Sequence, residues 1–255
     1  MEITTKERSN KKEQKASNKL GLILGAISAV IVIMVIIFTF LRTPEQITTM
    51  LTTIASDLQY YFLATHVIML LSIISGLVIK KFRSQIFIGF AIFLALSATI
   101  VSCIYAVIPN IFMFGLILSL LILFSVQKKL DLSFQNLNAF DIIFGVAGLL
   151  FGFWYLHWVN DPMWLNALLY SPLGGVNCPT LVSLTAVFCF SKKQRFNVLE
   201  LTIGTFTTYF GFFGIFRLQA YVDIALVLCG IYLIVRNIVY TIMTKEQKIL
   251  NGQIV

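Results

Sequence analysis

Charged residues are scarce in this chain of 255 residues, at 12% of the total, whereas hydrophobic residues make up 58%. Soluble globular domains carry about 25% charged residues, so this composition excludes an ordinary soluble domain. The 23 phenylalanines support the same conclusion, because bulky aromatic side chains on every face of a helix are tolerated only in apolar surroundings. We therefore predict an all-α bundle of helices embedded in a lipid bilayer.

Cysteine and histidine are also few, and they form no close ligand pairs. Three of the four cysteines lie in apolar runs, where a free thiol behaves as a small hydrophobe: Cys103, Cys189 and Cys229. Cys178, His66, His157 and Asp223 are predicted at one level of the membrane, but structural metal sites usually contain pairs of ligands close in sequence. We therefore predict neither a metal nor another cofactor, and we expect His66 to form ordinary hydrogen bonds within the bundle.

The sequence also lacks the motifs of several protein classes. The net charge of +8 is not arranged as a basic stripe interleaved with aromatic residues, so a nucleic-acid partner is not predicted. No G-x-S-x-G, H-E-x-x-H or phosphate-binding loop occurs, and no carboxylates are paired at catalytic spacing. Catalysis therefore has no positive support in the sequence.

Long apolar runs dominate what remains. Crossing a bilayer takes about 20 mostly apolar residues in a helix. The first run lacks a small-x-small cleavage site, so we expect a retained anchor rather than a signal peptide. Eight windows qualify: Leu20–Leu41, Tyr61–Ile79, Ile86–Ala106, Ile108–Val126, Ile142–Trp158, Pro172–Ser191, Val198–Phe216 and Ala220–Val235.

The positive charges predict the orientation of these spans, because cytoplasmic loops retain Lys and Arg. With the N-terminus inside and eight spans, all of the 19 basic residues except Arg42 and Arg217 fall on the cytoplasmic side. We predict a multi-pass protein of the cytoplasmic membrane with both termini in the cytoplasm. A flexible basic head (residues 1–19) precedes the bundle (20–240), and a short tail (241–255) follows it.

The sixth window is broken by the segment SPLGGVNCPTL, residues 171–181. Only Leu181–Phe190 is cleanly apolar, which gives about 15 Å of helix. Pro179 has no amide donor and disfavours helical geometry at Cys178, so the helix should begin near this pair. Irregular backbone at membrane depth must be buried by protein or line a water-filled cavity, and the sequence leaves both alternatives open.

If the break lines a cavity, it is the predicted binding site. The free amides and positive dipole of the helix start would attract anionic or carbonyl groups. The carbonyls of Gly174, Gly175 and Val176 would supply matching acceptors, because glycine lets a ligand approach the backbone closely. The candidate binding residues are Gly174, Gly175, Asn177, Cys178, Pro179, Thr180, His66, His157 and Asp223.

Two surface helices are predicted outside the bilayer core. Thr43-Pro44-Glu45-Gln46 combines an N-cap, a first-turn proline and a capping-box residue. The apolar residues that follow share one helical face: Ile47, Met50, Leu51, Ile54 and Leu58. A second, shorter helix is expected over Met163–Tyr170. Aromatic residues at the same level indicate an interfacial belt: Trp154, Tyr155, Trp158 and Trp164.

Other features have two interpretations each. Asp141 and Glu200 begin predicted spans, where a carboxylate favours the helix N-terminus; proton coupling is the alternative. A basic cluster, Lys80, Lys81 and Arg83, is followed 112 residues later by a second cluster with the same spacing. The two clusters either mark a four-plus-four repeat (20–126 and 142–240) or show only that cytoplasmic loops are basic.

Three segments together resemble a prokaryotic family of multi-pass membrane proteins known only as a domain of unknown function. They are Thr43-Pro44-Glu45-Gln46, SPLGGVNCPTL with its Cys178-Pro179-Thr180, and the closing stretch 212–230. The resemblance covers residues 43–235; the first span and its basic head are an addition, and the run before Asn177 has fewer prolines than the family pattern. It implies a topology and a motif but no activity.

The leading functional hypothesis is that the protein binds or passes a small solute at an outward-facing cavity beside Cys178-Pro179-Thr180. The alternative is a non-catalytic accessory subunit that packs against a membrane-protein partner or a second copy of the chain. A more distant hypothesis is an enzyme that acts on lipid or quinone through His66 and Cys178.

Overall fold

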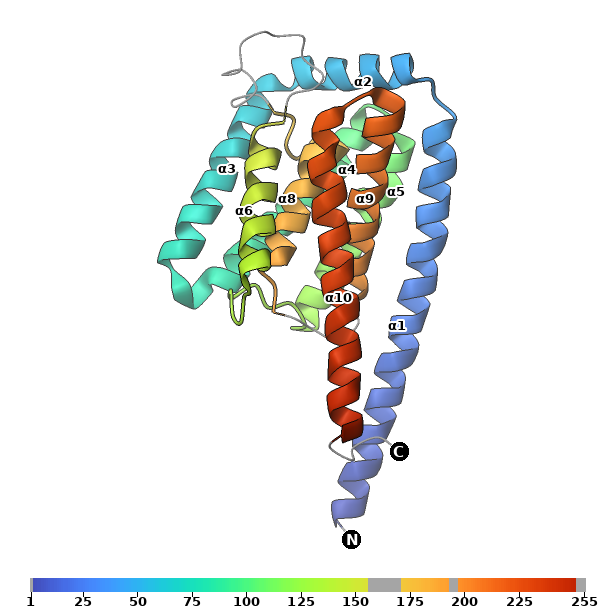
Figure 1. Ribbon diagram of the computed structural model, residues 1–255, viewed down its shortest axis with the longest axis vertical. Helices are drawn as coiled ribbons and strands as arrows, with labels where there is room; N and C mark the ends of the chain where they lie inside the picture. Colours follow the sequence, from blue (N-terminus) through green and yellow to red (C-terminus); the bar gives the residue numbers. More distant parts are fainter. Residues whose placement is uncertain (1, 156–170, 193–196, 251–255) are drawn as a thin grey trace.

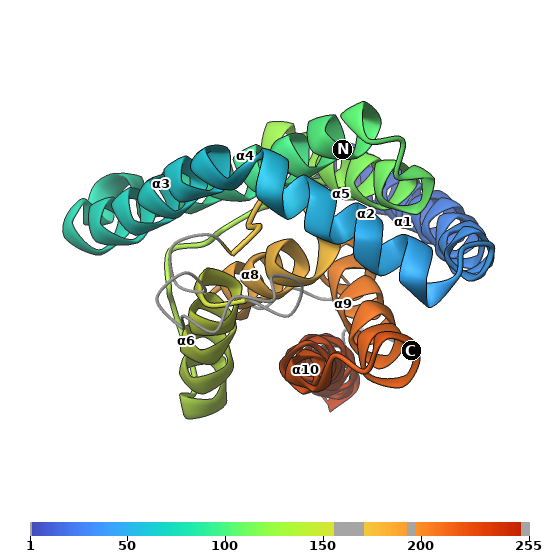
Figure 2. The same cartoon turned by 90° about the horizontal axis from the view of Figure 1, so that it is seen from above.

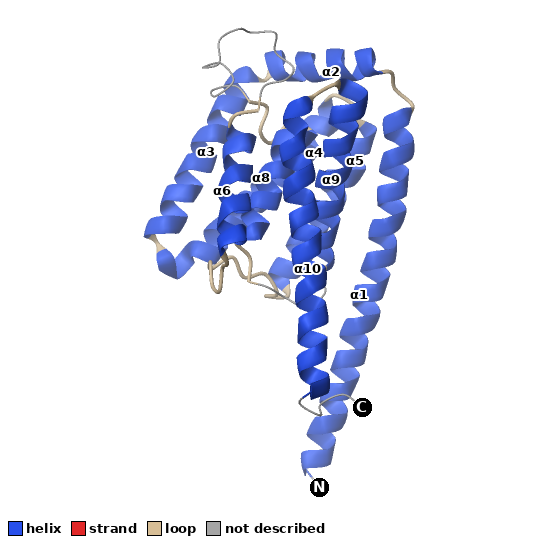
Figure 3. Cartoon of the chain, viewed as in Figure 1, coloured by secondary structure: helices blue, strands red, loops and turns tan. Residues whose placement is uncertain are grey.

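The structure, a computed structural model, describes residues 2–155, 171–192 and 197–250, and these residues form only helices and the turns between them (Figure 3). The all-α prediction is confirmed for this part of the chain. The helices are α1 (Glu2–Phe40), α2 (Pro44–Asp57), α3 (Gln59–Val78), η1 (Lys80–Phe82), α4 (Arg83–Ile104), α5 (Ile108–Val126), α6 (Ala139–Phe153), α8 (Asn177–Cys189), α9 (Val198–Leu218), η2 (Tyr221–Asp223) and α10 (Ile224–Leu250).

The helices form an upright bundle with α2 lying across one end (Figure 1). The start of α1 and the end of α10 both lie at the opposite end. We call these the α2 end and the termini end. From α3 onward, successive long helices run alternately between the two ends. Seen from the α2 end, α3, α4, α5 and α1 form one row, and α8 lies between this row and α6, α9 and α10 (Figure 2).

Six helical segments within the described residues are long and apolar enough to cross a membrane. They are Lys19–Phe40, Gln59–Val78, Lys80–Ile104, Ile108–Val126, Val198–Leu218 and Tyr221–Thr244. The chain therefore has the architecture of an integral, multi-pass membrane protein. The helices α6 and α8 have only 15 and 13 residues, below the usual spanning length of about 20, so the count of eight crossings stays a prediction. The orientation of the bundle in the membrane also stays a prediction.

The two terminal helices are long, and the flexibility of the head and tail stays a prediction. Helix α1 begins at Glu2 and α10 continues to Leu250, so both helices extend well past the bundle (Figure 1). The segment 2–19 is rich in Lys and Glu, which have high helix propensity, and it prolongs the apolar helix that follows it.

Helix α2 has the predicted capping box. Gln46 donates its backbone amide to Thr43 Oγ1 (3.3 Å) and accepts the Thr43 amide on Oε1 (3.0 Å), with Pro44 at the first helical position. Its apolar face packs against the ends of other helices and buries Ile47, Leu51, Ile54 and Ala55. At its other end, Tyr105 donates its hydroxyl to Asp57 Oδ2 (3.1 Å); desolvation and this carboxylate raise the pKa of Tyr105.

Helix α8 is the centre of the bundle, and every residue from Cys178 to Cys189 is buried. Helix α6 approaches it closely because α6 presents glycines along the contact. A methyl group at Gly148 would lie 2.8 Å from Ala186 Cβ and 3.1 Å from the carbonyl of Val182. Small residues at a helix interface let two backbones approach within the membrane.

The predicted capping role is present for Asp141, whereas at the start of α9 the cap is Asn197 and the carboxylate of Glu200 contacts other side chains. Asp141 accepts the backbone amide of Asn138 (2.8 Å) and donates its own amide to Asn138 Oδ1 (2.7 Å). Glu200 lies in the first turn of α9, where Asn197 accepts the amides of Leu199 and Glu200.

Candidate functional site

The break before α8 is a buried turn. Val176 donates its amide to the carbonyl of Pro172 (3.1 Å), and Gly174 adopts a positive φ of 78°, which favours glycine. The helix then begins at Asn177, two residues before Pro179, as the sequence predicts. The residues from Ser171 to Val176 are all buried, so this part of the break is sealed by protein.

Four predicted site residues hold this turn in place. Thr180 donates its hydroxyl to the carbonyl of Val176 (2.6 Å) and accepts the amide of Gly174 (2.9 Å). The carbonyl of Gly174 accepts the hydroxyl of Ser97. Gly175 lies against the ring of Phe62, with no room for a side chain, and Pro179 is buried. We expected the carbonyls of Gly174 and Val176 to face a ligand, but both accept hydrogen bonds from the protein itself.

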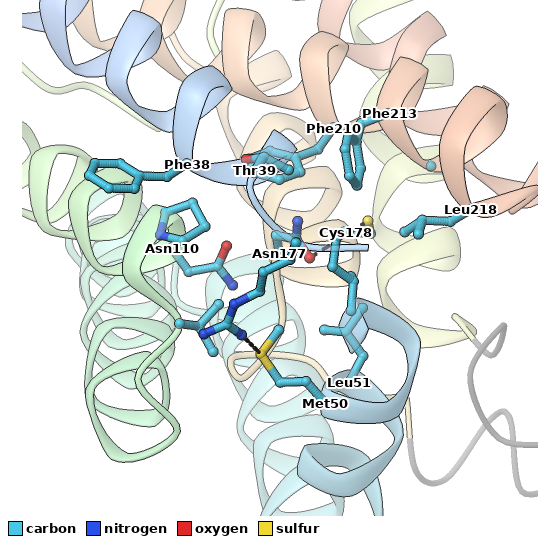
Figure 4. Close-up of a pocket in the computed structure, with 15 residues that line it drawn as sticks. Phe38, Thr39, Met50, Leu51, Asn110, Asn177, Cys178, Phe210, Phe213 and Leu218 are labelled. Carbon is cyan, nitrogen blue, oxygen red and sulfur yellow. Dashed lines mark hydrogen bonds between the residues drawn. The ribbon is translucent and has the colours of Figure 1, made fainter. Parts of the chain in front are cut away.

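The first turn of α8, in contrast, lines a pocket at the α2 end (Figure 4). The cavity has a volume of about 40 Å³, larger than the smallest cavity that holds a water molecule. Without side-chain movement it therefore admits only a small molecule. Its apolar walls come from α1, α2 and α9 and include Phe38, Ile47, Leu51, Phe210, Phe213 and Leu218.

Polar groups converge on this pocket from three elements. Asn110, in the first turn of α5, is only 3% exposed and directs its amide toward the cavity (Figure 4). Within the part of the chain that the structure describes, this amide makes no hydrogen bond. The backbone amides of Asn177 and Cys178 also lack an acceptor among the described residues, and no side chain caps α8. The guanidinium of Arg42 forms part of the lining.

Asp223 lies behind the Cys178 wall of the pocket. It is fully buried, accepts the hydroxyl of Tyr155 on Oδ1 (2.6 Å) and accepts the Cys178 thiol on Oδ2 (3.6 Å). The carboxylate fits there because Gly214, on α9, has no side chain. The structure thus brings together two predicted residues, Cys178 and Asp223. Tyr155 was expected in the interfacial belt and is buried instead, since its hydroxyl has this carboxylate as acceptor.

The chain matches no model of a protein family, no curated protein and no solved structure. The site must therefore be interpreted from its own geometry.

His66 does not line the pocket. His66 is 2% exposed, with Nδ1 2.6 Å from the carbonyl of Phe62 and Nε2 3.0 Å from the carbonyl of Phe153, so it joins α3 to α6. Among the described residues it has no contact with Cys178, and no group of three His, Cys, Asp or Glu residues could hold a metal. His157 and the expected helix Met163–Tyr170 lie outside the described residues.

A second polar cluster, at the termini end, was not anticipated. Arg236 on α10 is 7% exposed; its Nε lies 2.8 Å from Asp141 Oδ1, at an angle that makes an ion pair rather than a hydrogen bond. Its Nη1 lies 3.4 Å from Glu200 Oε2 and donates to the carbonyl of Phe188 (3.2 Å). Ser191 donates its hydroxyl to Glu200 Oε1 (2.6 Å). The cluster ties α6, α8, α9 and α10 together.

Proposed function

We propose that the protein binds a small solute in the pocket beside Cys178-Pro179-Thr180. The unpartnered amide of Asn110 carries this proposal. Buried polar groups are nearly always hydrogen-bonded. The amide of Asn110 has no protein partner among the described residues and reaches the cavity, so a bound molecule is the partner available to it. Asn110 faces the free amides that start α8, so a solute with hydrogen-bonding groups would satisfy both at once.

The predicted topology supports an outward-facing site. With both termini and the basic loops in the cytoplasm, the α2 end lies on the outer side of the membrane. The pocket then opens beneath the interfacial helix α2, within reach of solutes outside the cell. Helix α8 is buried along its length, so passage through the bundle would require helix movement, and we propose binding as the activity.

Thermal unfolding of the purified protein tests this proposal. The probes are acetate, propionate and butyrate and the three corresponding amides. A ligand at about 100 times its dissociation constant stabilises the folded state by about 2.7 kcal/mol. Asn110→Leu should abolish this stabilisation while leaving the unliganded protein at least as stable, because the substitution removes an unpaired polar group.

Ser102→Ala is the matched control. Ser102 is also fully buried with a hydroxyl that lacks a partner among the described residues, but it does not line the pocket. This variant should keep the full ligand-induced shift. A shift that persists in Asn110→Leu, or a wild-type protein that no probe stabilises, would contradict the proposal.

Cysteine labelling tests access from outside. In intact cells, a protein with Cys178 as its single cysteine should react with a membrane-impermeant thiol reagent. A matched variant with only Cys189, which is buried away from the pocket, should not react. An unlabelled Cys178 in a correctly inserted protein would mean that the pocket is closed to the outside, and it would favour the accessory-subunit alternative.

A further inference from the structure

The positive charge around the pocket indicates which chemical class of solute it binds. This inference rests on the proposed function. Arg42 lies two residues after the end of α1 and lines the pocket. Its Nη1 lies 2.7 Å from the sulfur of Met50, and its Nη2 donates a long hydrogen bond to the carbonyl of Ala106 (3.3 Å). A thioether is a weak acceptor, so neither contact replaces an anion.

Arg42 forms no ion pair with a carboxylate among the described residues. A second guanidinium adds to the positive charge here. Arg217 donates Nη2 to the carbonyl of Arg42 (3.2 Å), and its buried Nε lacks a partner within the described chain. The two arginines are therefore close to each other, and both would be stabilised by a nearby anion.

The start of α8 contributes positive potential to the same cavity. The backbone amides of Asn177 and Cys178 are free, and an α-helix carries a partial positive charge at its N-terminus. With the amide of Asn110 included, the polar groups that line the pocket are mainly hydrogen-bond donors. Glu45, in the first turn of α2, interacts electrostatically with Arg217, but it is not part of the lining. Asp223 is also outside the lining, and its two oxygens accept the hydroxyl of Tyr155 and the thiol of Cys178.

We infer that the solute is a small monocarboxylate anion. Its carboxylate accepts hydrogen bonds from Arg42, from the Asn110 amide and from the first amides of α8. Its short apolar part lies against aromatic and aliphatic walls such as Phe213 and Leu51. The cavity of about 40 Å³ limits this part to a few carbon atoms.

Pairs of probes that differ only in charge test the inference. Affinities for propionate and propionamide, and for butyrate and butyramide, are measured on the full-length protein at pH 7. Charge-assisted hydrogen bonds are about twice as strong as neutral ones, so each carboxylate should bind about tenfold more tightly than its amide. In Arg42→Gln the carboxylates should lose this tenfold advantage, while the affinities for the amides stay unchanged.

Lys80→Gln is the matched control, because it removes one positive charge from an exposed residue at the termini end that does not line the pocket. It should keep most of the preference for carboxylates. Amides that bind as tightly as carboxylates to the wild type would overturn the inference and leave the proposed function intact. A preference that survives in Arg42→Gln would also overturn it, whereas failure of all four probes would count against the pocket as a binding site.

Discussion

At the scale of single residues, the structure separates side chains that hold the fold from those that face the pocket. Thr180 and Asn177 are three positions apart and were candidates for the same role. The hydroxyl of Thr180 is used entirely within the turn before α8, whereas the amide of Asn177 lines the cavity. Substitutions at the two positions should therefore affect different properties, stability at Thr180 and ligand binding at Asn177.

Thr180→Val tests the structural role. Valine has nearly the shape of threonine but leaves the buried amide of Gly174 without its acceptor. We expect the free energy of unfolding to fall by about 1–3 kcal/mol, measured by denaturant titration in micelles. Thr180→Ser keeps the hydroxyl, so its free energy of unfolding should fall by less. Equal decreases in the two variants would argue against the hydrogen bond as the cause.

Arg236 has the largest predicted effect on stability. Arg236→Met leaves the carboxylates of Asp141 and Glu200 buried without this guanidinium. Breaking a buried ion pair from one side costs about 3–5 kcal/mol, so unfolding should occur at a much lower denaturant concentration. Lys80→Met removes an exposed cation at the same end and should change stability by less than about 0.5 kcal/mol. Similar losses in both variants would refute the special role of the buried cluster.

At the scale of helices, close approach between α6 and α8 positions the start of α8. Gly148→Ala adds one methyl group that would lie 2.8 Å from Ala186 Cβ, so the two helices must separate. Overpacking of this kind costs about 1–3 kcal/mol. Gly115→Ala on α5 has open space around the added methyl and should stabilise by up to about 1 kcal/mol through helix propensity. The same denaturant titration compares the pair, and a neutral or stabilising Gly148→Ala would contradict this packing.

At the scale of the whole molecule, the number of crossings depends on α6 and α8. Their short lengths allow either two crossings or a pair that enters and leaves on one side. Single cysteines in a cysteine-free protein distinguish these topologies. We expect labelling from outside the cell at Thr48→Cys on α2 and at Asn160→Cys between α6 and α8. Gln135→Cys, at the termini end, should be labelled only after permeabilisation. External labelling at position 48 but not at 160 would rule out eight crossings.

Much of this architecture was predictable because it is encoded locally. A capping box, a first-turn proline or a glycine at positive φ depends on residues a few positions apart. For this reason the start of α2 at Pro44 and the start of α8 at Asn177 followed from sequence. The interpretation of Arg236 as a loop cation failed because it lies on α10, one residue past the predicted end of a span.

The sequence by itself determined that this is a helical membrane protein with a broken helix before Cys178, because composition and local hydrogen bonding suffice for both. Only the tertiary structure decided which side chains meet: Asn110 with Asn177 at the pocket, Tyr155 with Asp223 behind it, and Arg236 with two distant carboxylates. The physical reason is the surrounding lipid. A helix face buried in protein and a face exposed to acyl chains are both apolar, so the sequence pattern does not show which face points inward.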